Sequence, residues 1–459
     1  MRLPFLDRVD EMSRLSRALD HPDGSMVCLY GRRRCGKSRL LREVLAGRKA
    51  VYHVGDERTE VLQRRALAQA MEQIIPRFAQ VEYPDWDVLL DRWWNDSPVG
   101  SVLALDEFPS LVTAAPFLPS LLQKRVDLHD GGGRHLVVAG SSQRMMQGLV
   151  LDAAAPLYGR CREVLRIEPL PPGFVAQAFR SKTATEALEA WATWGGIPRY
   201  WELALDFKDR QEAIRHLALD PMGVLHHEPE RLLLDDLRET PRASSLLAVI
   251  GQGCRKVSEM ARRLEQPATS LARPLQRLVG LGLVRREQPF DTDPATSRQS
   301  LYSIADPFLA FWYRHVDPNR SRLAAGQIDD VEADVGKRLR DHLGGVFEEL
   351  VRSQVHRLDV AGRKWQPASR WWGRGKDGQP LESDFMARSV DGTALLVGEV
   401  KVSLTLPGAR RAHAELREKI ARLPLRLPRT VIACLAYASS PLKIDFCKTV
   451  HAGTILGME

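Results

Sequence analysis

The sequence of 459 residues predicts an α/β protein made of several domains. Two observations favour this class. In the first third of the chain, short apolar runs alternate with helical stretches, as a parallel sheet covered by helices requires. In the last quarter, two apolar strands joined by a tight turn follow a helical stretch. We expect a parallel α/β core at 1–165, a helical lid at 166–235, a winged helix-turn-helix at 236–320 and a C-terminal α/β domain at 335–459.

The first element that carries chemistry is a glycine-rich turn after an apolar strand at 26–30. Residues 31–38 read G-R-R-R-C-G-K-S, the spacing of a phosphate-binding loop. The backbone N–H groups of such a turn point at a polyphosphate, and the N-terminus of the next helix adds positive charge. Lys37 would reach the β and γ phosphates and Ser38 would hold Mg²⁺. The predicted nucleotide-binding residues are Gly31, Arg32, Arg33, Arg34, Cys35, Gly36, Lys37 and Ser38.

Two further strand ends supply the rest of a nucleotide site. The apolar strand at 101–105 ends in Asp106 and Glu107. Asp106 would bind Mg²⁺ through water, and Glu107 would act as the base that orients the attacking water. The strand at 135–139 leads to Ser141, which is placed to sense the γ phosphate; a solvated strand end is the alternative. A further core strand is expected at 50–54.

The middle of the chain becomes helical and then predicts a winged helix-turn-helix. Pro274 is expected in the first turn of its third helix, where proline is tolerated. Arg273 and Arg277 on that helix could contact phosphates, or the unit could only pack against the core. The polar stretch 317–334 reads as a linker. The expected elements are helices at 244–250, 257–264 and 270–281 and strands at 284–287 and 300–303.

The C-terminal domain carries a second constellation of charged residues. Strands are expected at 382–387 and 395–401, joined by a turn at Asp391 and Gly392. Glu399 and Lys401 are two residues apart on a strand, so they share a face, and Asp384 lies on the paired strand.

Two carboxylates that hold a metal, with a lysine beside them, are what metal-dependent phosphodiester cleavage needs. We therefore expect Asp384 and Glu399 to bind Mg²⁺ or Mn²⁺ and Lys401 to act on the phosphate. A helix beginning at Gly344 would deliver Glu348 to the same site. A solvated strand face or a decayed centre is the alternative.

Charge and cysteine content limit the partners and the compartment. The formal net charge is +8, and residues 361–459 hold 16 Lys and Arg against 9 Asp and Glu. This basic excess favours a polyanionic partner such as DNA, with a solvated basic surface as the alternative. The six cysteines form no C-x-x-C pair, which suits a reducing cytoplasm. No apolar run is long enough for a membrane span, so we expect a soluble cytoplasmic protein without a membrane partner.

These motifs resemble those of the archaeal-type ATPases of prokaryotes, relatives of the STAND and origin-recognition ATPases, fused to a PD-(D/E)XK nuclease-like domain. The resemblance covers nearly the whole chain. It implies an AAA-like P-loop core, ATP with Mg²⁺, and a C-terminal domain like a restriction endonuclease. Its carriers are Phe5–Arg8, Gly31–Ser38, Leu105–Phe108, Ala139–Ser142, Pro156–Arg160, Gly195–Tyr200 and Asp306–Tyr313.

The resemblance also implies roles for single residues. Arg8 would lie near the adenine, although the Arg-Glu pair usual in the family is Arg8-Val9 here. Arg160 matches an arginine that can act as an arginine finger, in a homo-oligomer if it acts between subunits. Pro198 matches the lid proline on the nucleotide side. Asp384, Glu399 and Lys401 match the nuclease motif.

The sequence thus predicts an ATP-gated, Mg²⁺-dependent DNA nuclease, with a role in defence or mobile elements as a further conjecture. Two other readings stay open. One is an ATPase switch protein whose C-terminal domain binds DNA or a partner without cutting. The other is a toxin-like or transcription-linked module in which the winged unit recognises a particular site.

Overall fold

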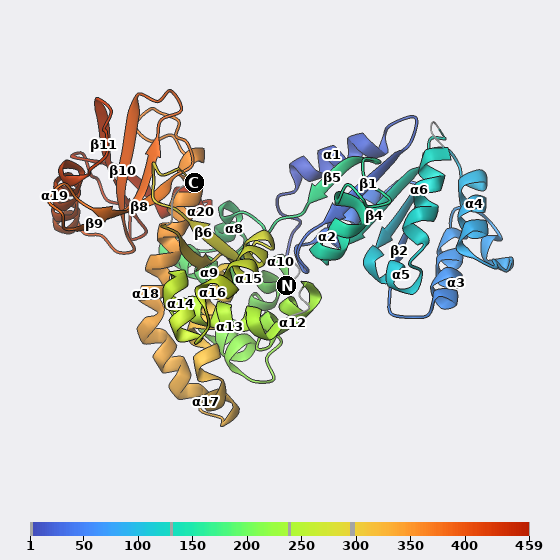
Figure 1. Ribbon diagram of the computed structural model, residues 1–459, viewed down its shortest axis with the longest axis horizontal. Helices are drawn as coiled ribbons and strands as arrows, with labels where there is room; N and C mark the ends of the chain where they lie inside the picture. Colours follow the sequence, from blue (N-terminus) through green and yellow to red (C-terminus); the bar gives the residue numbers. More distant parts are fainter. Residues whose placement is uncertain (1–2, 129–131, 237–239, 294–298, 459) are drawn as a thin grey trace. The chain divides into compact units, whose positions relative to one another are not determined.

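The computed structural model describes residues 3–128, 132–236, 240–293 and 299–458. The chain divides into two compact units (Figure 1). The N-terminal unit consists mainly of Phe5–Leu170, and the C-terminal unit mainly of Pro171–Leu233 and Arg238–Glu459. Each unit is described by itself.

The N-terminal unit is built on a five-stranded parallel sheet with the strand order β2-β3-β4-β1-β5. Strands β3 and β4 lie inside this sheet and are buried along their whole length, as parallel strands covered on both faces must be. The strands are β1 (Ser25–Tyr30), β2 (Ala50–Val54), β3 (Val102–Asp106), β4 (His135–Gly140) and β5 (Cys161–Arg166).

Helices connect these strands and cover the sheet. One face packs on an apolar cluster that contains the fully buried indoles of Trp86 and Trp93. The helices are α1 (Val9–Leu19), α2 (Lys37–Leu45), α3 (Glu60–Met71), α4 (Trp86–Asp96), α5 (Phe108–Ala114), α6 (Leu118–Leu128) and α7 (Gln143–Met146). The four strands expected from the sequence are confirmed to within one residue. The sequence analysis missed β5, because Cys161–Arg166 alternates polar and apolar residues at the sheet edge.

The C-terminal unit begins with helices and continues with a small two-stranded antiparallel sheet. Three helices precede this sheet at nearly the expected positions. The helices are α8 (Val175–Phe179), α9 (Ala184–Trp194), α10 (Pro198–Ala204), α11 (Arg210–Ile214), α12 (Glu228–Asp236), α13 (Thr240–Gly251), α14 (Val257–Arg263) and α15 (Ala268–Gly280), and the strands are β6 (Val284–Glu287) and β7 (Leu301–Ile304).

The position of Pro274 differs from the expectation. Helix α15 begins at Ala268, directly after Pro267, so Pro274 lies in the helix interior and not in the first turn. A proline there cannot donate to the carbonyl four residues earlier, which costs stability. The helix nevertheless continues, because Leu271, Leu275 and Leu278 are buried on one face and pack into the domain core.

The stretch expected to be a linker is helical. Residues 320–324 form α17 (Arg320–Ala324), and a single helix of 27 residues, α18 (Ile328–Gln354), follows. At 1.5 Å per residue this helix is about 40 Å long. Its polar first half reads as a linker in the sequence because only one narrow face, including Val331 and Val335, is buried. The helix that carries Glu348 therefore begins at Ile328 and not at Gly344.

The last part of the chain forms a second five-stranded sheet, with the order β12-β11-β10-β9-β8. Strands β8, β9 and β10 are antiparallel, whereas β10, β11 and β12 run parallel. Helix α18 packs on β9 and β10, and α19 on β10 and β11. The remaining elements are α16 (Pro307–His315), β8 (Ser369–Arg374), β9 (Pro380–Arg388), β10 (Ala394–Lys401), α19 (Leu406–Arg422), β11 (Thr430–Tyr437), β12 (Lys448–His451) and α20 (Ala452–Leu456).

Candidate functional site

The phosphate loop lies where β1 ends and α2 begins, as the sequence predicts. Gly31 has φ 145°, and a Cβ there would lie 2.4 Å from the carbonyl oxygen of Ile167. Gly36 has φ 93° just before the first turn of α2. Only glycine fits these two positions, so the loop backbone keeps the close turn that a polyphosphate needs.

Lys37 lies over this loop. Its side chain is buried, and its Nζ donates to the carbonyl oxygens of Gly31 at 2.8 Å and Arg32 at 3.1 Å. Burial lowers the pKa of Lys37, while the nearby carboxylates of Asp106 and Glu107 oppose that shift. Asp106 and Glu107 favour the charged form of Lys37, but among the described residues no carboxylate forms an ion pair with it. The loop therefore fits a phosphate group, which would supply an anion in direct contact with Lys37.

Asp106 and Glu107 meet the loop from the end of β3. The hydroxyl of Tyr52 donates to Asp106 Oδ2 at 2.6 Å, and the N–H of Glu107 donates to Asp106 Oδ1 at 2.9 Å. The Oγ of Ser141 donates to Glu107 Oε1 at 2.7 Å. Glu107 adopts φ 49°, a left-handed conformation that is uncommon for glutamate. The ends of β3 and β4 thus hold both acids in fixed positions.

The sequence analysis did not identify Tyr52. Burial and the hydrogen bond to Asp106 raise the pKa of its phenol, and a hydrogen bond with Ser38 opposes that shift. Tyr52 therefore touches both residues that we expect to serve Mg²⁺, Ser38 and Asp106. The pairing of β2 with β3 brings it there, and a tyrosine near the end of a strand adjacent to Asp106 was the available signal.

Arg8 is buried beside the phosphate loop. Its Nη2 donates to the carbonyl oxygens of Cys35 at 3.1 Å and Glu168 at 2.6 Å, and its Nη1 donates to Glu11 at 2.8 Å. Arg8 thus ties the loop to the segment after β5. The structure shows this brace, and the contact of Arg8 with an adenine stays a prediction.

Arg160 lies far from the phosphate loop of its own chain. Strands β1 and β5 are parallel, with Met26 paired with Cys161 and Tyr30 with Arg166. Arg160 therefore lies at the N-terminal ends of these strands, and the phosphate loop follows the C-terminal end of β1. At about 3.3 Å per residue the two ends are about 16 Å apart, more than an arginine side chain spans. Its Nε and Nη2 both donate to Asp127 at 2.8 Å. Arg160 therefore does not reach the phosphate loop of its own chain in this structure, and its role as an arginine finger, from its own chain or a neighbour, stays a prediction.

The lid proline, Pro198, is the first residue of α10 in the C-terminal unit. Its contact with the nucleotide, which would bind in the other unit, also stays a prediction.

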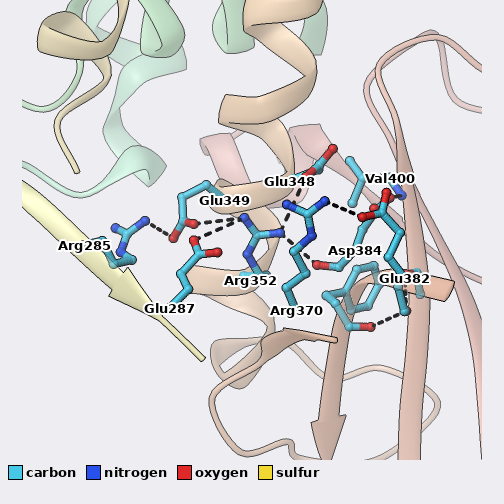
Figure 2. Close-up of polar contacts among 12 residues, drawn as sticks. Arg285, Glu287, Glu348, Glu349, Arg352, Arg370, Glu382, Asp384 and Val400 are labelled. Carbon is cyan, nitrogen blue, oxygen red and sulfur yellow. Dashed lines mark hydrogen bonds and ion pairs between the residues drawn. The ribbon is translucent and has the colours of Figure 1, made fainter. Parts of the chain in front are cut away.

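The second constellation lies where α18 meets β9 and β10 (Figure 2). Asp384 and Glu399 are both buried, and Asp384 Oδ2 accepts a hydrogen bond of 2.8 Å from the N–H of Val400. Burial raises the pKa of Glu399, and the negative charge of Asp384 raises it further. Burial and Asp384 raise the pKa of Glu348 in the same way. Glu348, Asp384 and Glu399 therefore converge, as the sequence predicts.

Two lysines neutralise part of this negative charge. Lys419 Nζ on α19 donates to Glu399 Oε1 at 2.6 Å, and the half-exposed Lys401 lies 3.5 Å from Glu399 Oε2. The sequence pointed to Lys401 but not to Lys419, which lies in a helix 18 residues later. A divalent cation fits these carboxylates, because burial and the charge of Asp384 raise the pKa values of Glu348 and Glu399 and a cation would offset both effects. In the described ranges, however, no three His, Cys, Asp or Glu side chains form a ready-made metal cluster.

A buried arginine, Arg352, connects this centre to the two-stranded sheet. Its Nη1 donates to the carbonyl oxygen of Asp384 at 2.8 Å and lies 3.7 Å from Glu348, while its Nη2 donates to Glu349 at 3.0 Å and lies 3.6 Å from Glu287 on β6. Arg285, also on β6, pairs with Glu349. Figure 2 shows Arg352 between the side chains from β6 and the centre on β9. The sequence analysis missed this cluster, because its members lie about 65 residues apart.

Two family models match parts of the chain. Residues 5–203 match a family described as an ATPase domain predominantly from Archaea. The chain therefore carries an archaeal-type P-loop ATPase domain. Residues 312–412 match a second family, described as archaeal and bacterial proteins of unknown function. That match contains Glu348, Asp384, Glu399 and Lys401 but assigns no activity to them.

Individual proteins are similar to this chain over most of their own length. An uncharacterized protein of Methanocaldococcus jannaschii is 28% identical over 405 residues, covering 86% of this chain and 87% of that protein. A Walker-type ATPase of Pyrococcus abyssi is 22% identical, with a TM-score of 0.52, over 67% of this chain and 95% of its own. This second likeness shows a shared fold. The ORC2 protein of Aeropyrum pernix, solved with ADPNP and ADP, is 13% identical with a TM-score of 0.46, over 73% of this chain and 96% of its own.

The family match and the parallel sheet with its phosphate loop support an ATPase function for the N-terminal unit. In the part of the chain that the structure describes, no helix is both long and apolar enough to cross a membrane.

Proposed function

We propose that this protein hydrolyses ATP in its N-terminal unit and that its nucleotide state gates Mg²⁺-dependent cleavage of DNA by the C-terminal unit. The observation that carries the nuclease half is the convergence of Asp384 with Glu348 and Glu399, beside Lys401. The proposal keeps the division into ATPase core, helical lid, winged helix and nuclease-like domain at 1–165, 166–235, 236–320 and 335–459.

Each residue of the proposed centre has a separate task. Asp384 and Glu399 would hold a divalent cation, Mg²⁺ or Mn²⁺, through their oxygens. A bound cation polarises the phosphate and provides an activated water. Lys401 is the exposed cation of the group, so it stabilises the negative charge that develops on the scissile phosphate. The positive excess of residues 361–459 favours contact with a polyanion at this end of the chain.

The three helices α13–α15 and the β6–β7 pair are proposed as a winged helix that contacts DNA. Arg273 and Arg277 lie on α15. In the proposed unit α14 and α15 form the helix-turn-helix, and α15 is its second helix, the one that contacts DNA in such motifs. Phosphate contacts from these residues would hold a duplex without reading its sequence.

In the ATPase half, Lys37 and Ser38 would bind the phosphates and Mg²⁺, Asp106 the metal through water, and Glu107 the attacking water. Arg160 would contribute from a neighbouring copy, because its partly exposed side chain lies at the far end of the strands, out of reach of its own loop. The protein would then hydrolyse ATP as a homo-oligomer.

A second function, a switch protein that binds without cutting, is favoured by one observation. Lys419 forms a hydrogen bond of 2.6 Å with Glu399, so a lysine already satisfies a carboxylate that a metal would need. In this reading the C-terminal unit binds DNA or a protein partner and releases it with the nucleotide state.

A substrate panel separates the two functions. Plasmid, linear duplex, single-stranded DNA and RNA are incubated with the protein in Mg²⁺ or in Mn²⁺, with and without ATP. Cutting that needs metal and responds to ATP supports the first function. Binding of DNA without cutting under every condition supports the second function. Footprinting then shows whether the winged unit selects a particular sequence.

A further inference from the structure

A cavity of the C-terminal unit lies beside the Arg352 cluster and belongs to neither proposed centre. It has a volume of about 190 Å³ and lies among β6, β7, α13, α16 and α18. Four arginines line it, from four different elements or turns: Arg255, Arg285, Arg314 and Arg352. Two acids also line it, Glu287 and Glu349. The cavity therefore has more positive than negative groups in its wall.

The acids account for only two of these arginines. Arg285 pairs with Glu349, and Arg352 contacts both Glu349 and Glu287. Arg255 and Arg314 are both half-buried, and their guanidinium groups have no hydrogen-bond or ion-pair partner among the residues that the structure describes. Burial lowers the pKa of His342, which also lines the cavity, to about 4, so it adds no charge at neutral pH. The lining residues thus carry two more positive than negative charges, and the nearby Glu348, on which Arg255 also acts, lies outside the lining.

Two partly desolvated guanidinium groups without a carboxylate in direct contact are unfavourable. In a purely structural cluster we would expect each to have a carboxylate, as Arg285 and Arg352 have. A ligand that carries two negative charges would satisfy both, with charge-assisted and bidentate hydrogen bonds.

The size and the remaining walls narrow the ligand further. At about 30 Å³ per water, a cavity of 190 Å³ holds roughly six waters. That is room for a phosphate group with a short carbon skeleton. Trp191, Ile250 and Leu350 supply an apolar wall for that skeleton.

We propose that this cavity binds a phosphate monoester dianion through Arg255 and Arg314. The dianion has two sources with the same chemistry, a small sugar phosphate or the 5′-phosphate at the end of a nucleic-acid strand. Binding does not require the ATPase or the cutting activity. Arg352 lines the cavity and also holds the carbonyl of Asp384, so the bound phosphate would lie one side chain from the proposed metal centre.

Calorimetry on the full chain in EDTA tests this site without any cutting. The probes are ribose 5-phosphate and a 5′-phosphorylated single-stranded oligonucleotide, with ribose and the 5′-hydroxyl oligonucleotide as matched controls. We expect at least one phosphorylated probe to bind at least about tenfold more tightly than its control. Binding of ribose 5-phosphate indicates a small-molecule site, and binding of the oligonucleotide alone indicates a strand-end site.

Variants assign the binding to the cavity. Arg255→Ala and Arg314→Ala should each weaken it by at least about tenfold, and Arg255→Lys by less, because it keeps the charge. Arg340→Ala is the control. It removes an exposed arginine of α18 that does not line the cavity, and it should leave the binding of the phosphorylated probe unchanged. Lys37→Ala, which alters the phosphate loop, should also leave binding intact.

Three results would overturn the proposal. The phosphorylated probes bind no better than their controls to the wild type; or binding is lost in Lys37→Ala, which would place it in the phosphate loop; or Arg255→Ala and Arg314→Ala bind as the wild type does. Because the first comparison uses only the wild-type protein, the proposal is tested even if a variant fails to fold.

Discussion

The Oγ of Ser141 donates a hydrogen bond of 2.7 Å to the carboxylate of Glu107. This bond joins the ends of β4 and β3, beside the phosphate loop. It holds the proposed base in a fixed direction, although Glu107 has a left-handed backbone conformation. A residue that we expected to sense the γ phosphate thus contacts the residue that we expect to activate water.

We predict different effects for three variants of this site. Lys37→Ala should lose ATP binding. Glu107→Gln should bind ATP but hydrolyse it about 10²- to 10⁴-fold more slowly, because the base is removed and the loop is intact. Ser141→Ala should bind ATP and hydrolyse it about tenfold more slowly, the effect of one lost hydrogen bond. Fluorescent-nucleotide binding and steady-state phosphate release measure the two steps. A wild-type hydrolysis rate in Glu107→Gln would show that Glu107 is not the base.

Arg160 should act between chains. We predict that Arg160→Ala keeps ATP binding and loses about 10³-fold or more in turnover. Mixing Arg160→Ala with Lys37→Ala should restore part of the activity, because one variant then supplies the arginine and the other the loop. Turnover of the mixture against each variant alone measures this. An unchanged turnover in Arg160→Ala would leave the residue with only its structural bond to Asp127.

Arg352 should be a positioning residue for the metal centre. Arg352→Lys keeps a positive charge but cannot contact Asp384 and Glu349 at once in the same geometry. We predict that the affinity for Mn²⁺ falls about 10- to 100-fold. Electron paramagnetic resonance of bound and free Mn²⁺ measures this affinity. Arg374→Lys is the control, because Arg374 is exposed and bonds only the Gly378 carbonyl among the described residues. A lower melting temperature with unchanged Mn²⁺ affinity would reduce Arg352 to a purely structural role.

The pKa shifts of the acidic centre predict a pH-dependent stability. Burial, aided by Asp384, raises the pKa of Glu348 and of Glu399 in the folded protein. The folded protein then holds protons that the unfolded chain releases above about pH 4.3, so stability falls as pH rises through the raised pKa values. Glu348→Gln removes one such group. Its melting temperature relative to wild type, measured in EDTA, should rise between pH 4.5 and 7.5. A difference independent of pH would contradict these shifts.

Sequence patterns predicted the parts of the fold that local signals determine. The phosphate loop, the four expected strands of the N-terminal sheet and the β9–β10 hairpin followed from apolar runs and turn residues. Strand β5 was missed because edge strands alternate polar and apolar residues, and α18 was split because half of it has only a narrow buried face.

Site residues, like elements of the fold, could be predicted where a local sequence signal marked them. Asp384, Glu399 and Lys401 could be found because they are close in sequence along one hairpin. Tyr52 and Lys419 were missed, because the strand pairing and the packing of α19 bring them to partners that are distant in sequence. The Arg352 cluster depends on contact between α18 and β6, which no local pattern encodes.

The central claim, a metal centre that cuts DNA in a protein that also hydrolyses ATP, is tested most directly by measuring both activities in the same samples. Cleavage of the best substrate and release of phosphate from ATP are followed in Mg²⁺ for the wild type, Asp384→Asn, Glu399→Gln and Lys401→Ala. We predict that all three variants lose cleavage, that EDTA stops it in the wild type, and that ATP hydrolysis in Mg²⁺ is retained throughout. Absence of cleavage by the wild type in both Mg²⁺ and Mn²⁺, or cleavage by the variants at the wild-type rate, would contradict the nuclease assignment.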